Sequence, residues 1–326
     1  MIIVRSPLRI SLGGGGTDLS SYYLKKSGFL IAAAIDKYVY VTINKPFSEG
    51  IYLKYSKSEN VKKVNDVDHK IIREALMMQD YENPQIEITT LTDIPAGTGL
   101  GSSGSFTTAL IRALYAYNKR HINQEQIAQM ACEIEIDRLK EPIGKQDQYI
   151  ASYGGISGFV FRKDDSVNCQ PLNLSAKTIG LLEDNLLLFF TGFSRNASDI
   201  LRNQKEKSVQ NDDEMIKNLD ITKEIGLKSK EFLENGQLDD FGFLMHEHWQ
   251  HKKNRSPDMT NSYIDEWYNT GIQAGALGGK VVGAGGGGFL MFYTNDPQKL
   301  RDKMSEIRLE EVKFRFDFEG TKLIYS

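Results

Sequence analysis

The chain has little of what a disulfide-stabilised or zinc-binding protein needs. Cysteine occurs only twice in 326 residues, at Cys132 and Cys169, and neither has a partner at metal-ligand spacing. This scarcity argues against a disulfide framework or a zinc site. It favours two buried thiols in a reducing cytoplasm.

Net charge and long apolar runs are scarce as well. The formal net charge is −3, with Lys and Arg spread through the chain, so no sequence-wide field attracts nucleic acid or an anionic membrane. No apolar stretch approaches the length of a membrane span. The segment Met1–Arg9 alternates like a strand and does not resemble a secretion signal. We therefore predict a cytoplasmic protein without nucleic-acid or membrane partners, and the sequence leaves a homodimer open.

What remains is the composition of an ordinary globular enzyme. Hydrophobic residues make up 40% and charged residues 25% of the chain, which allows a packed core. The length suits two domains that share a cleft. Any anionic ligand must then be held by local groups.

Patterning in the first half predicts strands interleaved with helices. Strands are expected at 2–12, 35–44 and 85–91, and amphipathic helices at 105–119 and 124–139. After a domain boundary between about residues 165 and 185, the second half restarts with an apolar strand. Its expected elements are the strand 186–190, helical sequence over 199–235, a further helix up to Gly279, a strand at 289–293, another helix, and a last strand at 314–318.

A glycine-rich loop before the first amphipathic helix predicts a polyphosphate site. Glycine lets the backbone approach an anion, and the helix N-terminus behind it offers free N–H groups. No Lys precedes the serine pair, so this is not the common P-loop, and a metal ion is expected to neutralise charge. A plain turn with a serine N-cap is the alternative. The predicted contacts are Pro95, Gly97, Gly99, Leu100, Gly101, Ser102, Ser103 and Gly104.

A second glycine run, Gly283–Gly288, contains a formal dinucleotide fingerprint and is the best argument for an oxidoreductase. That fingerprint needs a helix after it, whereas Phe289–Tyr293 is a predicted strand. The run therefore reads as a loop between strands, with a simple hairpin loop as the alternative. Gly285 and Gly286 are predicted to border the substrate.

A third glycine run, after the first strand, ends in Thr17 and Asp18. A hydroxyl beside a carboxylate suits a polyol ligand, although Asp18 could instead cap a helix over 20–26. The segment Gly144–Tyr149 carries Asp147 and follows a helix that contains Glu135. A carboxylate can accept a proton from an acceptor hydroxyl, and another can bind a metal; a solvated surface charge is the alternative for either acid.

Three histidines, at positions 246, 248 and 251, cluster with Trp249. On a helix only His248 and His251 share a face, and no acid completes a recognised metal triad. Histidines on the surface or lining a cleft are the favoured interpretation.

The order of these segments resembles the GHMP kinase superfamily, which includes galactokinase, homoserine kinase, mevalonate kinase and phosphomevalonate kinase. The resemblance runs from Ile3 to about Tyr293. It implies an α+β, two-domain fold with the active site between the domains. The N-terminal domain, residues 1–175, would resemble ribosomal-protein S5 domain 2, and the C-terminal domain, residues 176–326, would be ferredoxin-like.

The resemblance also implies roles for single residues and the use of ATP and Mg²⁺. The segment Gly97–Ser103 matches the ATP phosphate loop, and Ser103 with Glu135 matches the magnesium ligands. Asp147 matches the catalytic aspartate, and Arg9 matches the basic residue beside it in galactokinases. Direct transfer of the γ-phosphoryl group to a sugar hydroxyl is the expected reaction.

Thr17 and Asp18 match the end of the galactokinase sugar signature, but Gly15 and Gly16 replace its Glu-His pair, which argues against galactose. Within the superfamily the chain looks similar to the D-glycero-D-manno-heptose 7-phosphate kinases. The features that carry this likeness are the four glycines before Thr17, the runs 33–38, 144–149 and 191–197, and Trp249 followed by Lys252.

That likeness implies phosphorylation of the anomeric C1 hydroxyl of a heptose 7-phosphate to the 1,7-bisphosphate, with an L-fucose-type 1-kinase as the alternative. Arg195, in a loop after the strand 186–190, is a candidate for binding the acceptor's phosphate, because Arg suits bidentate phosphate contacts. A surface arginine is the competing interpretation.

Overall fold

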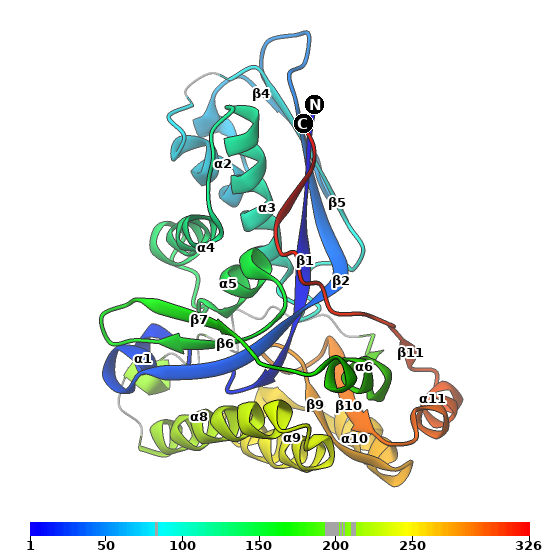
Figure 1. Cartoon of the computed structure of the whole chain (residues 1–326). Helices are drawn as coiled ribbons and strands as arrows, with labels where there is room; N and C mark the ends of the chain where they lie inside the picture. The colour runs from blue at the N-terminus through cyan, green and yellow to red at the C-terminus, as the bar shows by residue number, and fades with distance from the viewer. Residues whose placement is uncertain (82–83, 193–201, 203, 205, 210–212) are drawn as a thin grey trace.

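The computed structural model describes the whole chain except residues 82–83, 193–201, 203, 205 and 210–212. Its sheets and helices form the expected α+β architecture (Figure 1). None of the helices in the described ranges combines the length and apolarity that a bilayer crossing needs.

An eight-stranded sheet dominates the first half, with strand order β12-β1-β2-β5-β3-β4 and with β6 and β7 continuing from β2. Helices α2 to α5 cover one face of the sheet's long central strands, as Figure 1 shows. The strands are β1 (Ile2–Gly13), β2 (Gly28–Asn44), β3 (Ile51–Lys54), β4 (Ser58–Val61), β5 (Ile86–Thr92), β6 (Ile156–Phe161), β7 (Val167–Pro171) and β12 (Lys322–Tyr325).

The helices of this half follow the predicted pattern, with two changes at their ends. Helix α3 begins at Ser102, three residues earlier than expected, and the helix predicted over 124–139 ends in a π-helical turn, Glu133–Arg138. The helices are α1 (Ser20–Lys26), α2 (Lys70–Met77), α3 (Ser102–Tyr117), α4 (Gln124–Cys132) and α5 (Gln146–Tyr153).

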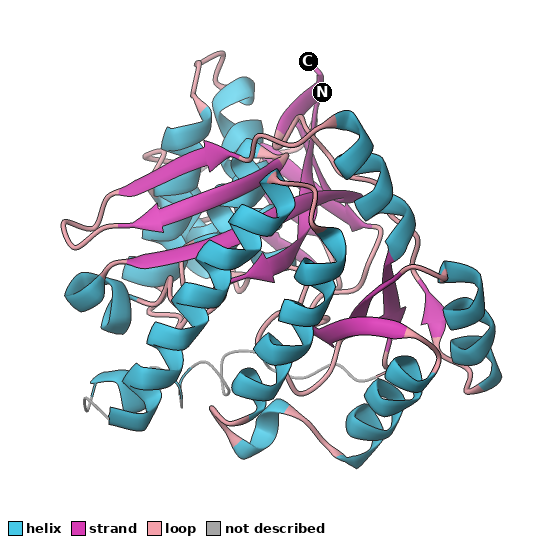
Figure 2. Cartoon of the chain, turned by 60° about the horizontal axis from the view of Figure 1, so that its bottom comes forward, coloured by secondary structure: helices cyan, strands magenta, loops and turns pink. Residues whose placement is uncertain are grey.

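A smaller sheet of four strands, in the order β11-β8-β10-β9, forms the second half. Figure 2 shows helices packed beside both sheets. The strands are β8 (Leu186–Phe190), β9 (Ala276–Val281), β10 (Phe289–Thr294) and β11 (Glu310–Glu311). The helices are α6 (Ala176–Asn185), α8 (Asp213–Glu234), α9 (Leu238–Lys253), α10 (Ser262–Gln273) and α11 (Pro297–Glu306).

Alternation over residues 8–12 of β1 separates core-facing from cavity-lining side chains. Leu8, Ile10 and Leu12 are fully or almost fully buried and pack against residues of β8 and β10, so both sheets share one hydrophobic core. Because successive strand side chains point to opposite faces, Arg9 and Ser11 point the other way and line a cavity. The shared core thus supports the floor of that cavity.

Two predicted elements of the second half are wrong. The helix expected up to Gly279 ends at Gln273, where Gly275 adopts φ 105° and breaks it, and 276–281 is a strand. No strand forms over 314–318: Phe316 makes one isolated bridge to Ile35. The chain then returns to the large sheet, where β12 pairs antiparallel with β1 and brings both chain ends together (Figure 1).

Close packing of α9 on the small sheet predicts a sensitive glycine. A Cβ added at Gly242 would lie 2.8 Å from Cδ1 of Tyr293 and 2.9 Å from Cβ of Leu277. Gly242→Ala should therefore lower the free energy of unfolding by about 1–3 kcal/mol, as overpacked cores usually do, measured by urea titration. Gly180→Ala in α6 is the matched control, because a Cβ there meets nothing within 4 Å. Indistinguishable urea midpoints for the two variants would contradict this packing.

Candidate active site

A cavity of about 550 Å³ lies where the glycine-rich loops meet the first turns of α3 and α5. Its walls bring together segments that are far apart in the sequence. They include Arg9 on β1, Asp18 after the first glycine run, Ser103 on α3, Glu135 on the π-helical turn, and Asp147 on α5.

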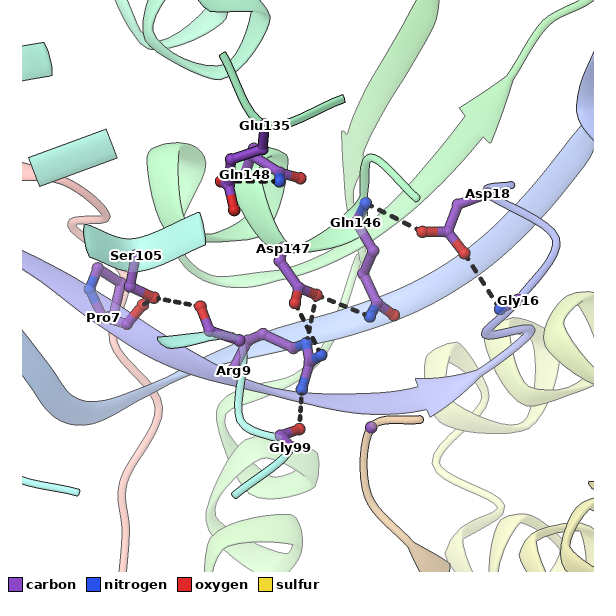
Figure 3. Close-up of polar contacts among 12 residues, drawn as sticks. Pro7, Arg9, Gly16, Asp18, Gly99, Ser105, Glu135, Gln146, Asp147 and Gln148 are labelled. Carbon is purple, nitrogen blue, oxygen red and sulfur yellow. Dashed lines mark hydrogen bonds and ion pairs between the residues drawn. The ribbon is translucent and has the colours of Figure 1, made fainter. Parts of the chain in front are cut away.

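Arg9 connects β1, on which it lies, to α5 and to the glycine-rich loop before α3. Its Nε and Nη2 donate to the two carboxylate oxygens of Asp147, at 2.7 and 3.0 Å, and its Nη1 donates to the carbonyl of Gly99 (Figure 3). Its backbone N–H bonds the carbonyl of Leu100 at 2.9 Å. The side chains of Arg9 and Asp147 are 6% and 28% exposed, so this bidentate, charge-assisted contact is partly shielded from water. It fixes the orientation of Asp147 relative to the loop.

A chain of contacts leads from Asp147 to the first glycine run. Gln146 donates from Nε2 to Asp147 at 3.1 Å, and its backbone N–H donates to Asp18 at 3.1 Å (Figure 3). The other oxygen of Asp18 accepts from the Gly16 N–H. Burial raises the pKa of Asp18, and the Gln146 bond opposes that rise. Asp18 does not cap α1, whose N-cap position is Leu19, so that alternative is wrong.

Glu135 is buried at the opposite side of the cavity. It accepts a hydrogen bond from the Ser103 hydroxyl and another from Nε2 of Gln148 at 3.0 Å. Burial raises its pKa to about 7, although both hydrogen bonds act to lower it. Figure 3 shows Glu135 and Gln148 facing one another above Asp147. A cation beside this carboxylate would relieve the cost of its burial.

The first turn of α3 points into the same space. Gly101 occupies the N-cap position with φ 77° and no side-chain cap, so the serine N-cap alternative is wrong. Since the first N–H groups of a helix lack intrahelical acceptors, those of residues 102–104 are available to an anion. Gly104 lies directly against α5, and a Cβ there would be 2.9 Å from Cβ of Asp147.

The predicted residues divide into two groups. The cavity is lined by Arg9, Asp18, Gly97, Gly99, Gly101, Ser102, Ser103, Gly104, Glu135 and Asp147. Five others are not among the residues that line it: Pro95, Leu100, Thr17, Gly285 and Gly286. Arg195 lies outside the described residues.

Two of the residues that do not line the cavity, Thr17 and Gly286, make hydrogen bonds within the protein. The Thr17 hydroxyl is fully buried and donates to the carbonyls of Gly14 and Phe29, at 2.9 and 2.8 Å. Gly286 bonds through its N–H to Met259. In the glycine run 283–288, the residues that line the cavity are the first two, Gly283 and Ala284.

The sequence reasoning missed a group of cations in the cavity. Lys252 at the end of α9, Arg255 after it and Lys280 on β9 all line the cavity, together with His248. Because a helix was expected up to Gly279, no local signal in the sequence marked Lys280 as a residue of a buried strand. In the described part of the chain, no three His, Cys, Asp or Glu side chains gather at metal-binding spacing.

Comparisons with known proteins cover nearly the whole chain. The family models for the GHMP kinases N-terminal domain and the GHMP kinases C-terminal domain match residues 69–155 and 229–308. D-glycero-alpha-D-manno-heptose 7-phosphate kinase from Campylobacter jejuni is 30% identical over 98% of both chains. The bifunctional fucokinase/GDP-fucose pyrophosphorylase of Arabidopsis thaliana is 26% identical over 94% of this chain but only 31% of its own.

Solved structures share the fold. A D-glycero-D-manno-heptose 1-phosphate kinase from Bacteroides thetaiotaomicron superposes over the full length of both chains with a TM-score of 0.82 at 24% identity. Galactokinase of Lactococcus lactis gives a TM-score of 0.78 at 16% identity, covering 98% of this chain and 94% of its own.

The raised pKa of Glu135 predicts how stability depends on pH. An ordinary glutamate pKa is 4.5 and that of folded Glu135 is about 7, so folding favours the protonated form. This stabilisation is complete below the unfolded pKa and is lost as pH rises through the folded pKa. Glu135→Gln keeps the group neutral, and its melting temperature in EDTA should therefore rise relative to wild type between about pH 5 and about pH 8.

The matched control is Glu133→Gln, which alters a carboxylate on the same turn that is 44% exposed and paired with Arg138. The two variants should diverge as pH increases. The same pH trend in both would show that burial of Glu135 does not set the effect.

Proposed function

This chain belongs to the GHMP kinases and is a sugar kinase, and we propose that it transfers the γ-phosphoryl group of ATP to the anomeric hydroxyl of a heptose 7-phosphate. The product would be the 1,7-bisphosphate. The 30% identity to the Campylobacter jejuni enzyme over 98% of both chains supports this substrate class. An L-fucose-type 1-kinase is the second candidate, favoured by the likeness to the plant fucokinase. ATP and sugar phosphates are metabolites of the cytoplasm, where we expect the enzyme to act.

One observation carries the proposal: Asp147 lies between two binding surfaces and is held there by Arg9. On one side is the first turn of α3 with its free N–H groups, a site suited to phosphates. On the other are Gln146 and Asp18, whose amide and carboxylate suit sugar hydroxyls. A carboxylate between a donor phosphate and an acceptor hydroxyl is what phosphoryl transfer requires.

The acceptor-side groups have unused hydrogen-bonding capacity. Ser11 Oγ and Gln146 Oε1 are buried and have no partner in the described structure. Because buried polar atoms are normally paired, both fit a polyol ligand. They lie around Gly15, since a Cβ there would be 3.0 Å from Ser11 Oγ and 3.9 Å from Gln146 Oε1.

In the proposed reaction, Asp147 accepts the proton of the acceptor hydroxyl as its oxygen bonds to the γ-phosphorus. The bond from that phosphorus to the β-phosphate oxygen breaks, and ADP leaves. Arg9 keeps the carboxylate aligned and offsets negative charge, because its guanidinium contacts both Asp147 oxygens. Positioning and charge neutralisation carry most of such catalysis.

The donor set at Ser103 and Glu135 fits Mg²⁺. A hydroxyl and a carboxylate are in mutual contact at the cavity wall, and hard Mg²⁺ prefers oxygen ligands while keeping waters and phosphate oxygens. These two residues would hold the ion, which supplies charge neutralisation for the triphosphate.

The substrate is tested by ADP release over a panel of free sugars and sugar phosphates, with the new phosphate located by phosphorus NMR. Heptose 7-phosphate should give the highest kcat/KM and a phosphate on C1. Faster turnover of free fucose would move the assignment to the second candidate.

Asp147→Ala should remove nearly all turnover while nucleotide affinity stays close to that of wild type. Asp147 meets the acceptor side of the cavity, whereas the free N–H groups of α3 lie on the donor side. We expect at least about a 100-fold loss of kcat, the usual scale for a lost general base. Retention of more than about a tenth of kcat would exclude that role.

Glu135→Gln should raise the Mg²⁺ concentration needed for half-maximal rate more than it raises the sugar KM. A neutral amide binds a hard cation less well than a carboxylate does. The measurement is ADP release over a magnesium titration, with Glu133→Gln as the control on the same turn. An unchanged magnesium dependence in Glu135→Gln would remove Glu135 from the metal site.

A further inference from the structure

Three cationic side chains are buried in the floor of the cavity on the acceptor side. Lys252, Arg255 and Lys280 are only 7%, 4% and 2% exposed, yet all three line the cavity. They come from the end of α9, the turn after it, and β9. Such a concentration of one sign of charge away from water is costly unless something compensates it.

Among the described residues, the hydrogen-bond partners of these cations are neutral groups. Lys280 Nζ donates to the Leu12 carbonyl at 3.0 Å and lies 3.3 Å from Nδ1 of His248. Lys252 Nζ donates to the carbonyls of Val281 and Gly283, at 2.9 and 2.5 Å.

Arg255 has neutral acceptors as well. It donates to the Gly15 carbonyl at 3.0 Å, to Asn218 Oδ1 at 2.8 Å and to Thr222 Oγ1 at 2.5 Å. Among the described residues, no ion pair joins a carboxylate to any of these three cations. The missing counter-charge is therefore expected from a ligand.

The pKa shifts of the three cations are those expected of a binding site for an anion. Burial, reinforced by the neighbouring cations, lowers the pKa of Lys280 to about 7 and that of Lys252 well below its usual value. Burial likewise lowers the pKa of Arg255 to about 10, and Asp18 opposes this shift. A bound dianion would return these groups to their charged forms.

The place of these three cations in the cavity indicates which anion they bind. The proposed binding site of the ATP phosphates is the first turn of α3, beside Ser103. Contacts on the acceptor side run from Asp147 through Gln146 to Asp18 and the glycines before it, and Arg255 bonds the carbonyl of Gly15 at their far end. An acceptor whose reacting hydroxyl meets Asp147 would therefore extend its other end toward Arg255 and Lys280.

We propose that Arg255 and Lys280, with Lys252 beside them, bind a phosphate monoester that the acceptor sugar already carries. This inference rests on the proposed function and assigns the specificity for a phosphorylated sugar to this cluster. Guanidinium and ammonium groups are the usual recognition elements for such a phosphate. Ser11 and Gln146 then contact hydroxyls between the two ends of the sugar.

The test compares Lys280→Met with wild type on heptose 7-phosphate and on the unphosphorylated heptose. The ratio of kcat/KM for the two acceptors should fall at least about tenfold, the scale of one lost charge-assisted contact. Lys280→Arg should keep most of the ratio. Lys253→Met is the matched control, because that lysine is 27% exposed and lies 3.8 Å from Asp265, outside the cavity.

A second readout is proton uptake when heptose 7-phosphate binds, measured by calorimetry in two buffers of different ionisation enthalpy near pH 7. Wild type should take up protons as Lys280, whose pKa is about 7, becomes charged, and Lys280→Met should take up fewer. The ionisable groups facing Lys280 are His248, Arg255, Lys252 and Arg9.

The outcomes separate this inference from the proposed function. Equal losses on both acceptors in a Lys280→Met protein with normal nucleotide affinity would overturn the cluster assignment and leave the kinase assignment standing. Preference for a different phosphorylated sugar, with the ratio still lowered by Lys280→Met, would overturn the heptose and support the cluster. If Lys280→Met does not fold, Lys252→Met on α9 provides the same comparison, and an unchanged ratio there would overturn the inference.

Discussion

The bidentate contact between Arg9 and Asp147 is the constraint on which the rest of the site depends. Arg9 is buried on the strand that contributes Leu8, Ile10 and Leu12 to the core shared by both sheets, and its guanidinium also binds the carbonyl of Gly99. One side chain thus couples the position of the glycine-rich loop to that of α5. Leu8 and Ile10 flank Arg9 on the opposite face of β1 and are buried in the core. The carboxylate that we propose to accept a proton is therefore held in place through a strand anchored in close-packed residues.

Several buried charged groups of the cavity have no oppositely charged hydrogen-bond partner among the residues that the structure describes. Glu135 is buried with hydroxyl and amide partners only, and the Lys252, Arg255 and Lys280 cluster has backbone and neutral side-chain partners. Both arrangements cost folding free energy, so sequences selected for stability alone would not keep them. The two imbalances are opposite in sign and lie at different ends of the cavity, one suited to a cation and the other to an anion. Substrates and metal would therefore stabilise the fold as they bind.

Local pattern predicted much of the fold and part of the site. Apolar alternation identified β1, a continuous apolar run identified β8, and glycine spacing identified the loop before α3, because these signals depend on neighbouring residues. The pairing of Asp147 with Arg9 could be expected only from family resemblance, since the two are 138 residues apart. The strand at Ala276–Val281 was missed because its glycines reflect close packing against α9, which is a tertiary requirement. For the same reason Lys280 gave no sign that it would face the cavity.

The return of the chain to its first sheet has a consequence for synthesis on the ribosome. Strand β12 pairs with Ile3, Val4 and Arg5 at the edge of β1, and Phe316 bridges to Ile35. As the nascent chain emerges, that edge therefore stays open until the four strands of the small sheet have been translated. An unpaired strand edge can pair with other chains, so the first half of the chain exposes a pairing edge until β12 emerges.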